Sequence, residues 1–290
     1  MYTLTIENKD GLQLEFNGIG AAYNITNAQG LSPAKTTINT NTAALIDGAT
    51  FNSAKVNMRS INLAFTIEYP VEANRLNVYK VLRAKEPITL TYTSNALNVF
   101  IEGYVETLTI GHFEQKQKAT VSILCPFPYW KNAQQVVNEL SAITNMFHFP
   151  FPYGDSSGQD MFTFAFGAID TEAKAVVVNN GGIETGLTFE LYAKEAVTNP
   201  KIFDYMTQDY IGLNFNMEAG DLIIINTMSG QKSVTLIRNA VETNIFNSLQ
   251  KGSTWLQLAA GGSVYVYQVD SGSLQSLEVD IKHYDLYEGV

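Results

Sequence analysis

Few residues in this chain have the types and the spacing that metal binding needs. The chain has one cysteine, Cys125, and three histidines, His112, His148 and His283, which lie far apart in the sequence. A structural zinc site uses four such ligands, so these residues do not indicate one. For His148, which lies between two phenylalanines, packing among aromatic side chains is preferred over a ligand role. A single cysteine forms no intramolecular disulfide, which is compatible with folding in a reducing cytoplasm.

Four carboxylates in the C-terminal half could in principle form a catalytic pair or a calcium site: Asp204, Asp209, Glu218 and Asp221. Each stands beside a predicted turn, where aspartate is common because its side chain bonds nearby backbone amides. Their spacing is not that of an EF-hand, and the sequence has no nucleophile elbow, zinc-protease motif, phosphate-binding loop or dinucleotide fingerprint. We therefore expect no enzymatic activity, no catalytic, cofactor-binding or metal-binding residue, and no cofactor.

The net charge of −10 over 290 residues is unevenly distributed. Residues 1–131 carry 11 Lys/Arg against 10 Asp/Glu, whereas residues 132–290 carry 7 against 18. Nucleic-acid binding needs clustered basic residues, and anionic membranes repel an acidic surface. The N-terminus lacks the features of a signal peptide, and no apolar run reaches the roughly 18 residues of a membrane span. We expect neither nucleic-acid binding nor membrane insertion.

Alternating apolar and polar residues predict a mainly β fold for the first half. One helix is predicted over residues 71–85, after Pro70 and with Val71, Leu76, Val78, Tyr79 and Leu82 on one stripe. The predicted strands cover residues 2–7, 12–16, 21–26, 56–69, 88–93, 99–110 and 119–125. Together they form an N-terminal domain over residues 1–131, a β-sandwich-like structure with one helix.

Two stretches of the first half stand apart from these strands. Residues 27–55 are polar and poor in large apolar side chains, so they form either a mobile loop or an arm that orders against a neighbouring chain. Residues 123–130 contain Pro126 and Pro128, which end a strand, and the aromatic residues Phe127, Tyr129 and Trp130. This stretch is either a plug that closes the first domain or an ordinary strand ended by proline.

Residues 132–152 are expected to connect the two halves. Within them, residues 134–146 suit a short helix or an irregular linker, and residues 147–152 must be extended because of their prolines. From residue 153 to 290, short strands separated by glycine-containing turns predict a β-sandwich. The predicted strands are residues 176–178, 186–192, 210–215, 221–225, 233–237, 255–258, 264–269 and 277–284. Exposed aromatic residues on such a sandwich could stack on sugars, although a core position is favoured.

In the order of its motifs, the chain resembles the distal tail protein family of long-tailed phages over almost its whole length. No single motif is decisive, and the shared order carries the resemblance. One departure is residues 45–49, where the family often has a turn rich in Gly, Arg and Asp. The matching segments are Gly20–Tyr23, Arg59–Ile61, Tyr79, Ile101–Val105, Cys125–Trp130, Phe149–Phe151, Gly186, Asn199–Pro200, Tyr210–Ile211, Gly220–Asp221, Ile225–Thr227, Ser253–Trp255, and Tyr284 with Tyr287–Gly289.

The resemblance implies an N-terminal ring-forming domain and a C-terminal galectin-like β-sandwich. It implies a homohexamer in the virion, at the tail tip or baseplate, after assembly in the host cytoplasm. The ring would join the major tail tube protein to the tail-associated tip protein and would act as a hub for receptor-binding or other peripheral baseplate proteins in host adsorption. The alternative function is a carbohydrate-binding β-sandwich module that contacts host cell-wall sugar.

Overall fold

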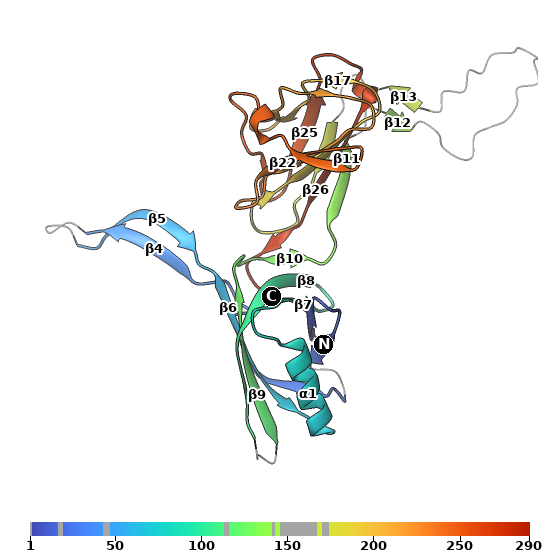
Figure 1. The fold of residues 1–290 in the computed structure, drawn as a ribbon. Helices are drawn as coiled ribbons and strands as arrows, with labels where there is room; N and C mark the ends of the chain where they lie inside the picture. Colours follow the sequence, from blue (N-terminus) through green and yellow to red (C-terminus); the bar gives the residue numbers. More distant parts are fainter. Residues whose placement is uncertain are drawn as a thin grey trace, which may run out of the picture. The chain divides into compact units, whose positions relative to one another are not determined.

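A computed structural model describes residues 2–16, 20–42, 47–112, 116–140, 143–145, 167–169 and 174–290 (Figure 1). The chain divides into two compact units: Met1–Gln134 together with Asp285–Val290, and Gln135–Tyr284. The described part contains one α-helix and two short 3-10 helices among 27 strands. The predicted mainly β fold with one helix is therefore confirmed.

The first unit is a β-barrel closed by its longest strand. The sheet order is β27-β10-β8-β7-β1-β2-β3-β6-β9, and β8 also pairs with β9, so the strands from β8 round to β9 close on themselves. The register of β8 and β9 shifts between Val105 and Thr107, and such a bulge lets a long strand bend. The strands are β1 (Thr3–Asn8), β2 (Gln13–Phe16), β3 (Tyr23–Gln29), β6 (Arg59–Ile67), β7 (Pro87–Thr93), β8 (Asn98–Ile110), β9 (Gln117–Cys125), β10 (Trp130–Asn132) and β27 (Leu286–Tyr287).

The alternation of β6 shows why the barrel forms. Ile61, Leu63, Phe65 and Ile67 are buried, whereas the residues between them are only partly covered. Successive side chains of a strand point to opposite faces, so this period-two pattern buries one face of β6. These side chains join a core cluster that also draws on β1, β2, β7, β8 and β9. The predicted strand over residues 56–69 is confirmed in substance.

The predicted helix is present, but its buried face differs from the predicted stripe. Helix α1 (Val71–Val81) packs against β1, β2 and β6. Its buried side chains are Val78 and Val81, followed by Leu82 just after the helix, whereas Leu76 and Tyr79 are exposed. Residues i, i+3 and i+4 share a helix face, and the barrel covers only the face at the C-terminal turn.

The plug interpretation of the stretch after β9 is confirmed for Trp130. Its side chain is fully buried in the core of the first unit. Phe127 and Tyr129 are partly buried and pack edge to face, with ring centroids 5.5 Å apart. Trp130 begins β10, which pairs with β8 on one side and with the C-terminal strand β27 on the other.

Most of the polar stretch over residues 27–55 is a β-hairpin. Strands β4 (Thr36–Asn41) and β5 (Thr50–Val56) pair with each other and with no other strand. Figure 1 shows this hairpin extending away from the barrel of its own unit. We call residues 30–58 the arm. Residues 43–46, which include part of the 45–49 departure, lie outside the described residues.

The second unit is a β-sandwich. A six-stranded sheet, β11-β26-β16-β21-β22-β23, and a four-stranded sheet, β14-β25-β18-β19, contribute to one core cluster. Small pairs complete the unit: β12–β13, β15–β24 and β17–β20. The strands are β11 (Val136–Leu140), β12 (Ile143–Asn145), β13 (Gly167–Ile169), β14 (Lys174–Val177), β15 (Thr185–Gly186), β16 (Thr188–Ala193), β17 (Val197–Thr198), β18 (Lys201–Asp204), β19 (Tyr210–Gly212), β20 (Asn216–Met217), β21 (Leu222–Asn226), β22 (Ser233–Arg238), β23 (Val241–Asn244), β24 (Gln257–Leu258), β25 (Ser263–Gln268) and β26 (Leu277–His283), with 3-10 helices η1 (Phe246–Ser248) and η2 (Leu274–Ser276).

Two expectations about chain organisation are corrected. Within the predicted connector 132–152, residues 134–146 suit a short helix or an irregular linker, yet residues 136–140 form β11 and pair along β26, because two adjacent valines suit the edge of a sheet. Residues 285–290 lie in the first unit instead of the sandwich, since β27 pairs with β10. The predicted extended segment 147–152, with His148, lies outside the described residues. So do Phe162, Phe164 and Phe166, whose alternation with other residues indicates a further strand.

Candidate functional site

Asp204 is a structural turn residue. Its buried carboxylate accepts hydrogen bonds from the Met206 amide at 2.8 Å, the Thr207 amide at 3.3 Å and the Ser263 hydroxyl at 2.6 Å. The Asp204 amide in turn donates to the carbonyl of Asp209 at 2.9 Å, which closes the turn between β18 and β19. The sequence interpretation of these residues as turn formers is confirmed.

Asp221 and Glu218 both form ion pairs with Arg238. Arg238 donates Nε and Nη2 to the two carboxylate oxygens of Asp221, at 2.7 and 2.6 Å, and Nη1 to Glu218 at 3.0 Å. The hydrogen bond from Arg238 holds the pKa of Asp221 below its usual range, against the opposing effect of burial. These carboxylates therefore serve a turn, through the Glu218 amide bond to Asp221, and ion pairs with one guanidinium.

The cysteine and the described histidines, which could act as nucleophile or metal ligands, lie in different segments of the chain. Cys125 is buried at the end of β9, and burial raises the pKa of its thiol to about 12, with the Arg59 guanidinium opposing this effect. His112 contacts Arg75 at 3.3 Å in the first unit, whereas His283 is buried at the end of β26 in the second. Across the described ranges, no group of three or more His, Cys, Asp or Glu side chains is placed to hold a metal ion.

The arm presents an exposed apolar face that no part of the described chain covers. Every residue of β4 and all residues of β5 except Val56 are exposed. Ile38 pairs with Ala54, and Thr40 pairs with Phe51 because the register shifts after Asn39. Directly opposed residues share a face of a sheet. The bulge therefore brings Phe51 to the side of Ile38 and Ala54, where regular pairing would have turned it away.

We call Ile38, Phe51, Ala54 and Val56 the apolar face of the arm. Ile38 and Phe51 are 61% and 63% exposed, which is unusual for side chains of this size. The opposite face is polar and internally bonded, with Asn39 donating to Ser53 at 3.0 Å and Thr37 bonding Asn57. A hairpin with one polar face and one apolar face is suited to lie with its apolar face on another protein surface.

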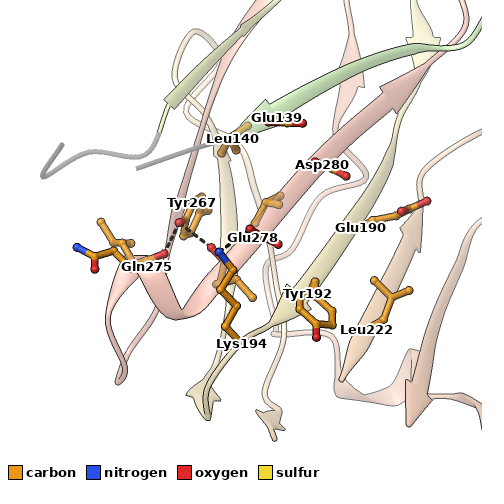
Figure 2. A pocket seen from close by; sticks show the side chains of 13 residues that line it. Glu139, Leu140, Glu190, Tyr192, Lys194, Leu222, Tyr267, Gln275, Glu278 and Asp280 are labelled. Atoms are coloured by element: carbon orange, nitrogen blue, oxygen red, sulfur yellow. Dashed lines mark hydrogen bonds and ion pairs between the residues drawn. The ribbon is translucent and has the colours of Figure 1, made fainter. Parts of the chain in front are cut away.

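The second unit has a pocket on the outer face of its six-stranded sheet (Figure 2). Its volume is about 230 Å³, below the roughly 300–1,000 Å³ of sites for drug-sized ligands, so it suits one small group. Tyr192 and Leu222 offer apolar surface to the pocket. Tyr267 forms its inner end, with its hydroxyl bonded to the carbonyls of Leu274 and Leu277. Carboxylates and Lys194 surround these side chains.

A row of three carboxylates crosses the sheet beside this pocket. Asp280 on β26 lies directly opposite Glu139 on β11 and Glu190 on β16. Burial raises the pKa of Asp280, and Glu139, Glu190 and Glu278 raise it further against the effect of Lys282. Two ion pairs relieve part of this charge: Lys282 with Glu190 at 2.7 Å, and Lys194 with Glu278 at 2.5 Å. The pocket can offer hydrogen bonds and negative charge, and it lacks the nucleophile–base geometry of a hydrolytic site.

Neither the pocket nor the apolar face of the arm was identified from the sequence as a named site. The pocket needs the pairing of β11 with β26, which neither a short helix nor an irregular linker over residues 134–146 includes. The arm was foreseen as one of two alternatives, and its bulge has no sequence signal beyond polar composition. In the part of the chain that the structure describes, no helix is long and apolar enough to cross a membrane.

These features define a class of protein. It is a two-unit β protein in which Asp204 and Asp221 stabilise turns and an ion pair, and in which an exposed hairpin is suited to contact another protein. Residues 180–283 match the family model described as siphovirus-type tail component, C-terminal domain. This part of the second unit therefore resembles the C-terminal domain of that family. The resemblance to distal tail proteins is confirmed by this match and by the fold of the whole chain.

Two solved structures have the same fold along almost the entire chain. The crystal structure of the SPP1 Dit protein (gp 19.1), described as a paradigm of the hub adsorption apparatus in phages that infect Gram-positive bacteria, has a TM-score of 0.67 at 13% identity and covers 98% of each chain. A chain of the phage P2 baseplate in its activated conformation with Ca has a TM-score of 0.50 at 12% identity, covering 97% of this chain and 98% of that one. No curated protein sequence matches.

Proposed function

We propose that this chain is a distal tail protein that forms a homohexameric ring in the tail tip or baseplate of the virion. The first unit would close the ring, and the second, galectin-like unit would lie outside it. The ring would join the major tail tube protein to the tail-associated tip protein and would hold receptor-binding or other peripheral baseplate proteins. The description of the SPP1 Dit protein as a hub of the adsorption apparatus supports this proposal.

The apolar face of the arm is the observation that carries ring formation. An isolated two-stranded hairpin is at best marginally stable in water. The arm has no core of its own, because only Val56 among the residues of β4 and β5 is even partly covered. A surface on a neighbouring copy would bury Ile38 and Phe51. Contact between two different surfaces on successive copies closes into a ring when the rotation is right.

The oligomeric state tests ring formation. We expect the purified protein, alone or with its tube and tip partners, to have about six times the 32.0 kDa mass of one chain in mass photometry. Phe51→Asp combined with Ile38→Asp should give monomers with both units folded. Asn41→Asp, which adds a charge to the polar face of the same hairpin, is the matched control and should still assemble. A wild-type monomer under every one of these conditions would overturn ring formation.

A second candidate function, binding of cell-wall sugar, is favoured by the pocket of the second unit. Tyr192 is 43% exposed beside Leu222, and sugar rings stack on such surfaces while carboxylates and lysines bond their hydroxyls. Titration of the protein with cell-wall glycans tests this function, with Tyr192→Ala as the variant that should lose binding and Tyr205→Ala as the exposed control. Glycan binding by a protein that stays monomeric would rank this function first.

A further inference from the structure

Arg59 is a buried cation, and the acceptors of its hydrogen bonds are all backbone carbonyls. It begins β6 and is 2% exposed. Its Nε donates to the carbonyl of Pro128 at 2.7 Å, Nη1 donates to Gly30 and Ser32 at 2.6 Å each, and Nη2 donates to Glu288. The guanidinium carbon also lies 5.8 Å from the centre of the Trp130 ring. The planar guanidinium has five N–H donors, so it can bond several carbonyls that surround it at once.

Arg59 thereby joins three segments that lie far apart in the sequence. Residues 30–32 begin the arm, Pro128 belongs to the stretch that precedes β10, and Glu288 lies near the C-terminus. A buried carbonyl without a partner costs about 1–3 kcal/mol, so each segment depends on the same side chain. Three of the segments that carry the family resemblance, Arg59–Ile61, Cys125–Trp130 and Tyr287–Gly289, meet at this point.

The C-terminal residues are held to the root of the arm by a second set of contacts. Strand β27 pairs with β10, and Leu286 is buried. The Val290 amide donates to the carbonyl of Leu31 at 3.2 Å. Gly289 lies so close to the arm that an added Cβ would be 3.1 Å from the Leu31 carbonyl oxygen and 3.2 Å from Pro33.

The two legs of the arm differ in how they are fixed. The leg after β5 runs directly into β6, which pairs on both sides within the barrel. The other leg leaves β3 at Gln29, where pairing with β6 ends, and crosses residues 30–35 before β4 begins. The leg of residues 30–35 is contacted by Arg59, Gly289 and Val290. They hold the part of the arm root that strand pairing leaves free.

We propose that Arg59 and residues 286–290 form a clasp that sets the direction in which the arm leaves the barrel. Arg59 is the positioning residue, and the C-terminal segment packs on residues 31–33. This inference rests on the proposed function in one respect, namely that a correctly directed arm is what a neighbouring copy binds. The clasp itself is a property of a single chain and can be measured without assembly.

Hydrogen exchange on the wild-type protein, followed by limited trypsin digestion of two variants, tests the clasp. The Val290 amide should exchange at least about tenfold more slowly than an unbonded amide, because opening must break its bond to Leu31. A variant ending at Asp285 keeps β26 and the whole second unit. In that variant, and in Arg59→Lys, cleavage at Lys35 and Lys55 should be about tenfold faster. Arg83→Lys, an exposed arginine of the same unit, is the control and should digest like the wild type.

The two readouts separate failure of the clasp from failure of the proposed function. Rapid exchange at Val290, or wild-type digestion of both variants, would overturn the clasp whatever the oligomeric state. Digestion of Arg59→Lys at the wild-type rate would show that the several hydrogen bonds of the guanidinium do not fix the arm root, and would remove Arg59 from the positioning role. Faster digestion with unchanged ring mass would keep the clasp and refute the arm as the ring contact. Because the exchange measurement uses the wild-type chain, a variant that fails to fold does not leave the clasp undecided.

Discussion

Asp221 accepts two hydrogen bonds from the guanidinium of Arg238, at 2.7 and 2.6 Å, while its own side chain is almost fully buried. Replacing Asp221 with Asn removes the charge and one acceptor. The expected result is a loss of about 1.5–3 kcal/mol in the free energy of unfolding at pH 7, the range for hydrogen bonds to charged groups. Glu218→Gln, at the exposed end of the same cluster, should change it by less than about 1 kcal/mol.

The effect of Asp221→Asn should depend on pH with a defined sign. Arg238 lowers the pKa of Asp221 in the folded protein, so this carboxylate stabilises the fold above its unfolded pKa of about 3.9. The stabilisation is lost as the pH falls below that value and through the folded pKa. Hydrogen exchange of β21 and β22 amides between pH 7 and pH 3 measures the difference, and a difference that grows on acidification would contradict the assignment.

Cys125 should be unreactive in the folded protein. Its thiol is fully buried, and burial raises its pKa to about 12, so almost no thiolate exists at pH 8. Because the thiolate is the nucleophile, iodoacetamide at pH 8 should modify Cys125 only after denaturation. Mass spectrometry of the intact chain reads this directly. Modification of the native protein at the rate of a free thiol would show that the end of β9 opens.

Gly30 and Gly11 form a matched pair for the arm root. Both have positive φ, +86° and +77°, so alanine at either position strains the backbone by about 1–2 kcal/mol. Only at Gly30 would the added Cβ also meet another atom, the Ser60 carbonyl oxygen at 2.1 Å, because Gly11 faces open space. Gly30→Ala should therefore destabilise the first unit more than Gly11→Ala, as measured by urea unfolding. Equal effects would show that strain alone decides and that the arm root does not need this close approach.

The parts of the fold that follow from local pattern were predictable from the sequence. The alternation of Ile61, Leu63, Phe65 and Ile67 predicts strand β6. The Asp-Gly pair at residues 10 and 11, between the predicted strands 2–7 and 12–16, is typical of a hairpin turn. Both signals depend on near neighbours only. The turn roles of Asp204 and Asp221 were predictable for the same reason.

The parts that depend on distant pairing were not predictable. Residues 136–140 have apolar spacing that suits a helix, and only the free edge of β26 makes them a strand. Likewise, nothing within Leu286–Val290 indicates that it returns to the first unit, since the partners are Trp130 and Leu31. The row of Glu139, Asp280 and Glu190, and with it the pocket wall, follows from the same non-local pairing.

The last prediction concerns Asp280, the middle carboxylate of that row. Like charges directly opposed across a sheet are unfavourable, and the pKa of Asp280 is raised by burial and by Glu139, Glu190 and Glu278, against Lys282. A raised folded pKa means that the ionised form costs stability at neutral pH. The cost disappears as the pH falls through the folded pKa toward the unfolded value of about 3.9.

Asp280→Asn should therefore stabilise the second unit at pH 7 by up to about 1 kcal/mol, the scale of one cross-strand pair. The gain should vanish below about pH 4, where wild-type Asp280 is protonated. Glu278→Gln is the matched control on the same strand and face, because Glu278 has its own ion pair with Lys194 at 2.5 Å and should yield no gain. Hydrogen exchange of β26 amides at pH 7 and pH 4 separates the two variants. A destabilising Asp280→Asn at pH 7 would mean that the attraction of Lys282 for Asp280 outweighs the repulsion of the three neighbouring carboxylates.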